Sequence, residues 1–136
     1  MTQTQYFEWL GAPLVNTRWS WGAVRSDGVI FLRAWQDETS IIDGKRHILV
    51  AQHLSFVDDQ SNLGYRERMV HVELIRQGAK CFIVMVEADL ALLPTRVIKD
   101  FNSDEVFSTG PIRQNGGDEW IELRQRVPAT HARKVS

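Results

Sequence analysis

The sequence of 136 residues contains a single cysteine, Cys81. One cysteine excludes an internal disulfide and makes a cysteine-ligated metal site implausible. Cys81 opens the apolar run Cys-Phe-Ile-Val-Met-Val, where we expect its thiol to be buried as a small hydrophobic group. Hydrophobic residues make up 43% and charged residues 24% of the chain, which is an ordinary globular balance. We therefore expect the chain to fold unaided around a hydrophobic core.

Long hydrophobic runs are also missing. No apolar stretch approaches the roughly 20 residues that a membrane-spanning helix needs. The first residues, Met1 to Glu8, have neither the basic start nor the apolar core of a signal peptide. The sequence therefore predicts a cytoplasmic protein that does not enter a membrane.

Charge of one sign is scarce as well. The chain carries 16 basic and 17 acidic residues, for a formal net charge of -1. No global field therefore draws the protein onto nucleic acid or an anionic membrane. Binding to nucleic acid would need a local patch of positive charge.

Motifs that carry catalysis are absent from the sequence. It has no Gly-x-Ser-x-Gly elbow, no His-Glu-x-x-His helix and no glycine-rich phosphate loop. The four histidines lack the spacing of metal ligands, and the paired carboxylates fall in predicted loops. We predict no catalytic residue, no metal site and no cofactor, and we favour a protein that is not an enzyme.

Turn signals and alternating apolar residues predict three β-hairpins. Their turns lie at Asp27-Gly28, Asp43-Gly44 and Gln114-Asn115-Gly116-Gly117. The strands they join are residues 19–26 with 29–36, 39–42 with 46–51, and 111–113 with 119–124. Further short extended segments are predicted at 96–101 and 105–107. A short strand or a helical turn is predicted at 6–10.

One amphipathic helix is predicted over Gly64 to Gln77. Its apolar residues Tyr65, Met69, Val72 and Ile75 follow helical spacing. Gly78 stands where a left-handed helix cap is expected, and residues 80–88 then form a β-rich run. We predict an α+β protein with a strand-dominated curled sheet or partly open barrel and one main helix. A single domain spans 1–128, and 129–136 form a frayed tail because they are poor in apolar residues.

Three tryptophans cluster around the first predicted hairpin. If they face a cleft, Trp19, Trp21 and Trp35 can stack against a base or surround a cation, with Arg18 beside them. Tryptophans in a small domain also commonly fill the core, and that alternative stays open.

The start of the predicted helix is the preferred anion-binding candidate. It carries Arg66 and Arg68 near a helix N-terminus, where the helix dipole attracts phosphate or carboxylate. His71 follows on the same helix and could titrate near neutral pH. An ordinary charged helix face is the alternative interpretation.

The sequence contains, in this order, the aromatic hairpin, the Gly-Tyr-Arg-Glu-Arg helix start at residues 64–68, the strand at 80–88, and the segment from Arg96-Val97-Ile98-Lys99 through the Trp120 strand. Together these features resemble the PUA-like superfamily, especially EVE-type domains. They are also similar to N-terminal reader domains that precede HNH nuclease domains in bacterial restriction proteins. The resemblance implies a pseudo-barrel that takes a modified base out of the stack into an aromatic pocket.

By this resemblance, Trp19, Trp21 and Trp35 would form the pocket wall and Arg18, Arg66 and Arg68 would contact phosphates, with Tyr65 among the ligand-binding residues. The leading hypothesis is a non-catalytic module that reads a nucleic-acid feature. The alternatives are a barrel, with or without enzymatic activity, that holds a small anion through Arg66, Arg68 and His71, and a protein that self-associates as a homodimer through exposed aromatic side chains.

Overall fold

The computed structural model describes residues 1–52, 62–89, 91 and 97–133. These residues include one eight-stranded sheet and three helices, so the protein is a strand-dominated α+β protein. The helices are α1 (Gln3–Trp9), α3 (Leu63–Arg76) and α4 (Ala129–Ala132). The strands are β1 (Gly22–Val24), β2 (Ile30–Trp35), β3 (Thr39–Ile42), β4 (Lys45–Ala51), β5 (Cys81–Ala88), β6 (Ile98–Phe101), β7 (Glu105–Asn115) and β8 (Asp118–Pro128).

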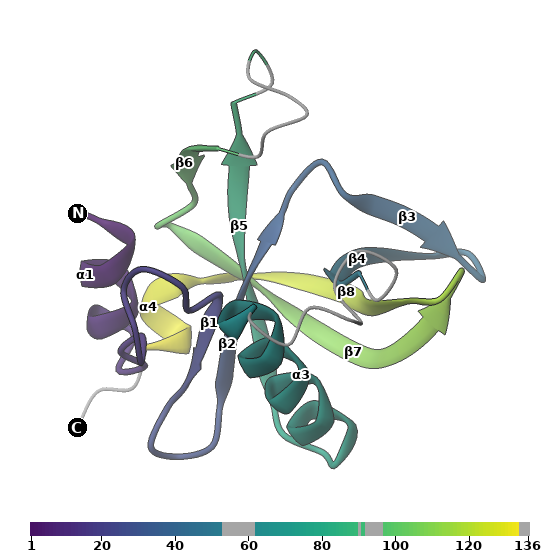
Figure 1. Cartoon of the computed structure of the whole chain (residues 1–136), viewed down its shortest axis with the longest axis horizontal. Coiled ribbons are helices and arrows are strands. Elements are labelled where there is room, and N and C mark those ends of the chain that lie inside the picture. The colour runs from purple at the N-terminus through teal and green to yellow at the C-terminus, as the bar shows by residue number, and fades with distance from the viewer. Residues whose placement is uncertain (53–61, 90, 92–96, 134–136) are drawn as a thin grey trace.

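The sheet is curled but not closed. Its strand order is β1-β2-β5-β7-β8-β4-β3, with β6 paired to the outer part of β5. The pair β2–β5 is parallel, and all other pairs are antiparallel. The curl brings β2 close to β4, although these strands are not paired. Helix α3 packs near the place where β2 approaches β4, whereas α1 and α4 lie together near the N-terminus (Figure 1).

The two central strands bury both of their faces. On β2, Leu32 points to the side of the sheet covered by α3, and Phe31 points to the side covered by α1 and α4. Ile83 and Phe82 divide β5 in the same way, which explains why both segments read as continuous apolar runs. The α3-side cluster consists of Ile30, Leu32, Ala34, Ile48, Val50, Val72, Ile75, Cys81, Ile83, Met85, Phe107, Ile121 and Leu123. The α1/α4-side cluster consists of Tyr6, Phe7, Leu10, Ala12, Ala23, Phe31, Phe82, Val84, Val106, Ala129 and Ala132.

The predicted main helix is confirmed as α3. Asn62 caps its start, because the Asn62 side chain accepts a hydrogen bond of 2.9 Å from the backbone N–H of Tyr65. Gly78 follows its end with a φ of 109°, the left-handed conformation expected for a glycine cap. Val72 and Ile75 bury one face of the helix in the α3-side cluster.

The predicted hairpins are present, with two differences. The first hairpin is shorter, since β1 begins only at Gly22, so Trp19 and Trp21 precede the strand. The last hairpin is longer, since β7 and β8 run for 11 residues each and include the segment predicted at 105–107. Its turn holds Gly116 and Gly117 at positive φ, as a tight two-residue turn requires.

Residues 129–132 form a short helix instead of fraying. Ala129 and Ala132 are buried in the α1/α4-side cluster. The prediction of a frayed tail is therefore wrong over these residues, because the two alanines are buried and the backbone N–H of Ala129 donates to the carbonyl of Asp104 at 2.8 Å. None of the helices among the described residues is long and apolar enough to cross a membrane.

A buried arginine ties the first hairpin to both terminal helices. The Arg25 side chain is 7% exposed, and its Nη1 donates to the carbonyl of Leu10 at 3.1 Å and to that of Ala132 at 2.6 Å. Its Nε and Nη2 donate to the Asp27 carboxylate at 2.9 and 3.0 Å. The positive charge of Arg25 is thus paired with the Asp27 carboxylate on the side of the sheet that α1 and α4 cover.

Candidate functional site

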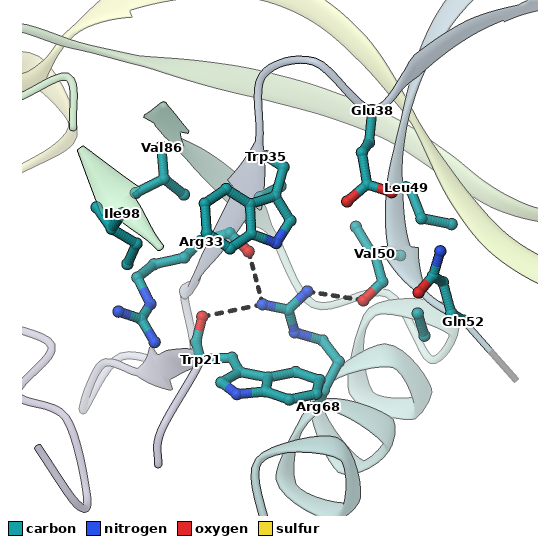
Figure 2. Close-up of a pocket in the computed structure, with 12 residues that line it drawn as sticks. Trp21, Arg33, Trp35, Glu38, Leu49, Val50, Gln52, Arg68, Val86 and Ile98 are labelled. Atoms are coloured by element: carbon teal, nitrogen blue, oxygen red, sulfur yellow. Dashed lines mark hydrogen bonds between the residues drawn. The ribbon is translucent and has the colours of Figure 1, made fainter. Parts of the chain in front are cut away.

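A cavity of about 470 Å³ opens where β2 approaches β4. This volume falls in the range of about 300–1,000 Å³ typical of small-molecule sites. Its walls come from both strands, from the start of α3 and from the strands β5 and β6. The lining residues are Trp21, Arg33, Ala34, Trp35, Glu38, Leu49, Val50, Ala51, Gln52, Arg68, Val86 and Ile98 (Figure 2).

Arg68 of α3 lies at the buried end of this cavity and links three segments. Its Nη1 donates to the carbonyl of Val50 on β4 at 2.7 Å. Its Nη2 donates to the carbonyl of Trp21 at 2.9 Å and to that of Arg33 on β2 at 2.7 Å. Because β2 and β4 are not paired, the guanidinium of Arg68 takes the place of missing sheet hydrogen bonds between them. The helix thereby joins the two strands that the curl leaves apart.

The Trp21 ring is held against the helix by two contacts. The Arg68 guanidinium lies 5.7 Å from the ring centroid, within cation–π range. Gly64, in the first turn of α3, packs directly against the indole, so that a Cβ there would overlap its Nε1 and Cε2 atoms and approach the Trp19 carbonyl to 2.6 Å. The glycine therefore permits the close approach that fixes Trp21 as a wall of the cavity.

Trp35 and Glu38 form the opposite wall. Trp35 ends β2, and its backbone carbonyl accepts from the N–H of Glu38 at 3.0 Å. The Glu38 carbonyl in turn accepts from the N–H of Leu49 on β4 at 3.0 Å. In Figure 2 the two indoles lie on either side of the Arg68 guanidinium, and the Glu38 carboxylate and the Gln52 amide face the cavity from the β4 side.

The charge at the buried end of the cavity forms no ion pair within the described part of the chain, although Glu67 lies near enough to interact with it electrostatically. Arg68 is 3% exposed, and burial lowers its pKa to about 10, so it stays charged at pH 7. Among the described residues, no carboxylate forms an ion pair with it. Burial raises the pKa of the neighbouring Glu67, whose Oε2 accepts from the Ser20 hydroxyl at 3.0 Å. Arg33 directs its guanidinium away, to Gln3 at 2.8 Å and to the Ser20 carbonyl at 2.7 Å.

The structure brings together three of the seven predicted site residues, namely Trp21, Trp35 and Arg68. The others do not line this cavity. Trp19 lies in a turn with its carbonyl against α3, and Arg18 is exposed beside it. Arg66 is exposed on the first turns of α3, and Tyr65 is buried, with its pKa raised by burial and by Glu119.

The side chains of the predicted anion site differ in their surroundings. Arg66 is exposed, whereas Arg68 is committed to backbone carbonyls and His71 is only 5% exposed. Burial, and then the Arg68 charge, lower the pKa of His71 to about 4, so the ring is neutral at pH 7. These three side chains therefore do not present positive charge together to solvent.

Sequence reasoning missed several lining residues. Glu38 belongs to one of the carboxylate pairs predicted to lie in loops, and Gln52 directly follows the strand predicted at 46–51. Leu49 and Val86 looked like ordinary strand residues. A polar residue just beyond the end of an apolar strand is the one signal that Glu38 and Gln52 share.

The cavity can bind a planar group, because two indoles line it together with hydrogen-bond donors and hydrogen-bond acceptors. The described residues contain no group of three or more His, Cys, Asp or Glu side chains able to hold a metal ion. Comparison with protein-family models, with curated proteins and with solved structures found no match. The cavity is therefore the feature of this chain that points to a function.

Proposed function

We propose that this chain is a non-catalytic binding module whose cavity, lined by Trp21 and Trp35, holds one unstacked nucleobase, with or without a modification. The observation that carries the proposal is the pair of indoles on two sides of one cavity of about 470 Å³. Stacking of a base on an aromatic side chain contributes about 1–3 kcal/mol. The volume leaves room beside a base for a substituent on the ring.

The surroundings of the cavity fit a nucleic-acid strand. Arg66 is exposed on the helix that carries Arg68, and Arg18 is exposed in the segment that packs on the start of this helix. Both are candidates for phosphate contacts, which position a strand without reading its sequence. A PUA-like pseudo-barrel, with the seam between β2 and β4 bridged by Arg68, is the architecture that accompanies this proposal.

Titration of the intrinsic tryptophan fluorescence with short DNA and RNA strands tests the proposal. The strands should carry modified or unmodified bases and be compared at low and moderate salt. We expect saturable quenching that weakens as salt is added, because phosphate contacts release counterions. No response to any strand would contradict the proposal.

The variants Trp35→Ala and Trp9→Ala form a matched pair. Both rings are partly buried, but Trp9 lies on α1, stacked on Tyr6 with ring centroids 5.9 Å apart. We expect Trp35→Ala to weaken strand binding by about tenfold or more, in line with the loss of one stacking partner. Trp9→Ala should leave binding unchanged. Equal losses in two variants that both stay folded would show that the cavity is not the binding site.

A further inference from the structure

Arg68, at the buried end of the cavity, has N–H groups that make no hydrogen bond to the described residues. A guanidinium carries five N–H groups, and Arg68 uses three of them on the carbonyls of Val50, Trp21 and Arg33. Its Nε has no hydrogen-bond partner among the described residues, although the side chain is almost completely buried. A buried donor without an acceptor is costly, and the Arg68 guanidinium lines the cavity, so an acceptor atom of a ligand beside this guanidinium would be favoured.

The place that an external cation would take is already occupied. Two indoles around one cavity can hold a cation such as a methylammonium group, but here the Arg68 guanidinium itself lies over the Trp21 ring, 5.7 Å from its centroid. No carboxylate neutralises it within ion-pair distance among the described residues. A second positive charge would be repelled at close range in a poorly solvated site.

Acceptor groups lie on the other side of the cavity. The Glu38 carboxylate only accepts hydrogen bonds, and the Gln52 amide both donates and accepts. Glu38 is half-buried, so solvent screens its charge more than that of Arg68. Glu38 therefore offsets only part of the repulsion that Arg68 exerts on a cation.

We propose, on the basis of the proposed function, that the cavity selects a neutral base, which presents an acceptor atom to Arg68 and an N–H donor to Glu38. Bases that carry a positive charge, such as those alkylated on a ring nitrogen, are rejected. A modification read by this site is therefore one that leaves the ring uncharged, on a ring carbon or on an exocyclic group.

Guanosine and 7-methylguanosine, compared below neutral pH, provide the direct test, because methylation of N7 then adds one positive charge and removes only the N7 acceptor from the edge of the base. Fluorescence titration of the full chain with each nucleoside should give binding of guanosine that is about tenfold tighter or more. Equal or tighter binding of 7-methylguanosine would overturn this inference while leaving the base-binding proposal standing. If neither nucleoside nor any oligonucleotide binds, the base-binding proposal fails as well.

Glu38→Gln and Asp37→Asn form the matched pair of variants. Asp37 is the exposed neighbour of Glu38 and does not line the cavity. We expect Glu38→Gln to weaken guanosine binding about fivefold to tenfold, because a charged acceptor becomes a neutral one, and Asp37→Asn to leave it unchanged. Unchanged binding in Glu38→Gln would contradict the assigned role of Glu38.

Arg68→Met removes the charge directly. If the variant folds, the preference for guanosine over 7-methylguanosine should fall to about twofold or less. A preference that persists would show that Arg68 is not its source. If the variant does not fold, the comparison of the two nucleosides and the Glu38 variants still decide the inference.

Discussion

Within the described part of the chain, each side of the sheet contains one buried arginine, and the two are held differently. On the α1/α4 side, Arg25 shares its charge with the Asp27 carboxylate at 2.9 Å and also bonds two carbonyls. On the α3 side, Arg68 bonds only carbonyls. Arg25 is 7% and Arg68 3% exposed, so the difference does not come from the extent of burial.

Arg25 stabilises the fold alone, whereas Arg68 stabilises the fold and also shapes a site. A buried charge that is paired with a carboxylate has little field left for a ligand. A buried charge that is surrounded by carbonyls keeps a positive potential, and at Arg68 that charge lies at the end of a cavity. We therefore expect changes on the two sides to affect stability alike but ligand binding differently.

The largest effect is expected from Arg68→Met. The variant leaves three carbonyls without their donor and removes the link between β2 and β4, so we expect a loss of unfolding free energy on the order of 3–5 kcal/mol. Urea unfolding followed by circular dichroism measures it. A loss below about 1 kcal/mol would show that the sheet does not need this bridge.

Arg25→Met is the control from the other side. It should cost on the order of 2–4 kcal/mol, less than Arg68→Met, because Asp27 is partly exposed and can be solvated. Ligand binding, measured where the variant is folded, should not change. A loss of binding in Arg25→Met would contradict the division between the two sides.

A smaller effect is expected from pH. His71 has a folded-state pKa of about 4, below the value of about 6.5 of an unfolded histidine. The unfolded chain thus binds a proton first as the pH falls, and stability is lost between about pH 6.5 and pH 4, by on the order of 1–3 kcal/mol. The raised pKa of Glu67 acts in the opposite direction.

The variant His71→Gln isolates this contribution. The unfolding free energy of the variant minus that of the wild type, followed from pH 7 to pH 4, should increase as the pH falls. His131→Gln on α4, where the histidine is exposed, is the control and should follow the wild type. A difference that does not vary with pH would contradict the assignment to His71.

The smallest effect on stability is expected from Gly64→Ala. The added Cβ overlaps the Trp21 indole, at a cost of about 1–3 kcal/mol, and the gain of about 1 kcal/mol in helix propensity offsets part of it. We expect a net loss of about 1 kcal/mol by urea unfolding, together with weaker ligand binding because Trp21 is displaced. Leu63→Ala, at the exposed neighbouring position, should leave binding unchanged. Unchanged binding in Gly64→Ala would mean that Trp21 is not a fixed wall.

Local signals predicted most of the fold. The turns at Asp27-Gly28, Asp43-Gly44 and Gly116-Gly117 set the hairpins, and helical spacing with Gly78 at the end set α3. These features depend on neighbours in sequence. Helix α4 was missed because Ala129 and Ala132 are buried by α1 and the sheet, which no local pattern reveals.

The site was predicted only in part for the same reason. Trp21 and Trp35 were named for their residue type, but so was Trp19, and only the start of β1 at Gly22 and the packing of Gly64 decide which tryptophans line the cavity. Arg68 was predicted as an exposed phosphate contact, whereas the curl of the sheet turns it inward to carbonyls. The curvature of the sheet depends on contacts between residues that are distant in sequence, so the spacing of residues along the chain does not predict it.

The most direct test of the account follows the indole N–H resonances of ¹⁵N-labelled protein while guanosine is added. We predict that the indole resonances of Trp21 and Trp35 shift with one common saturation curve, while that of Trp9 on the other side of the sheet stays in place. Two results would contradict this prediction. One is a shift of the Trp9 or Trp19 resonance alone, and the other is saturation with guanosine without a shift of the Trp21 or Trp35 resonance.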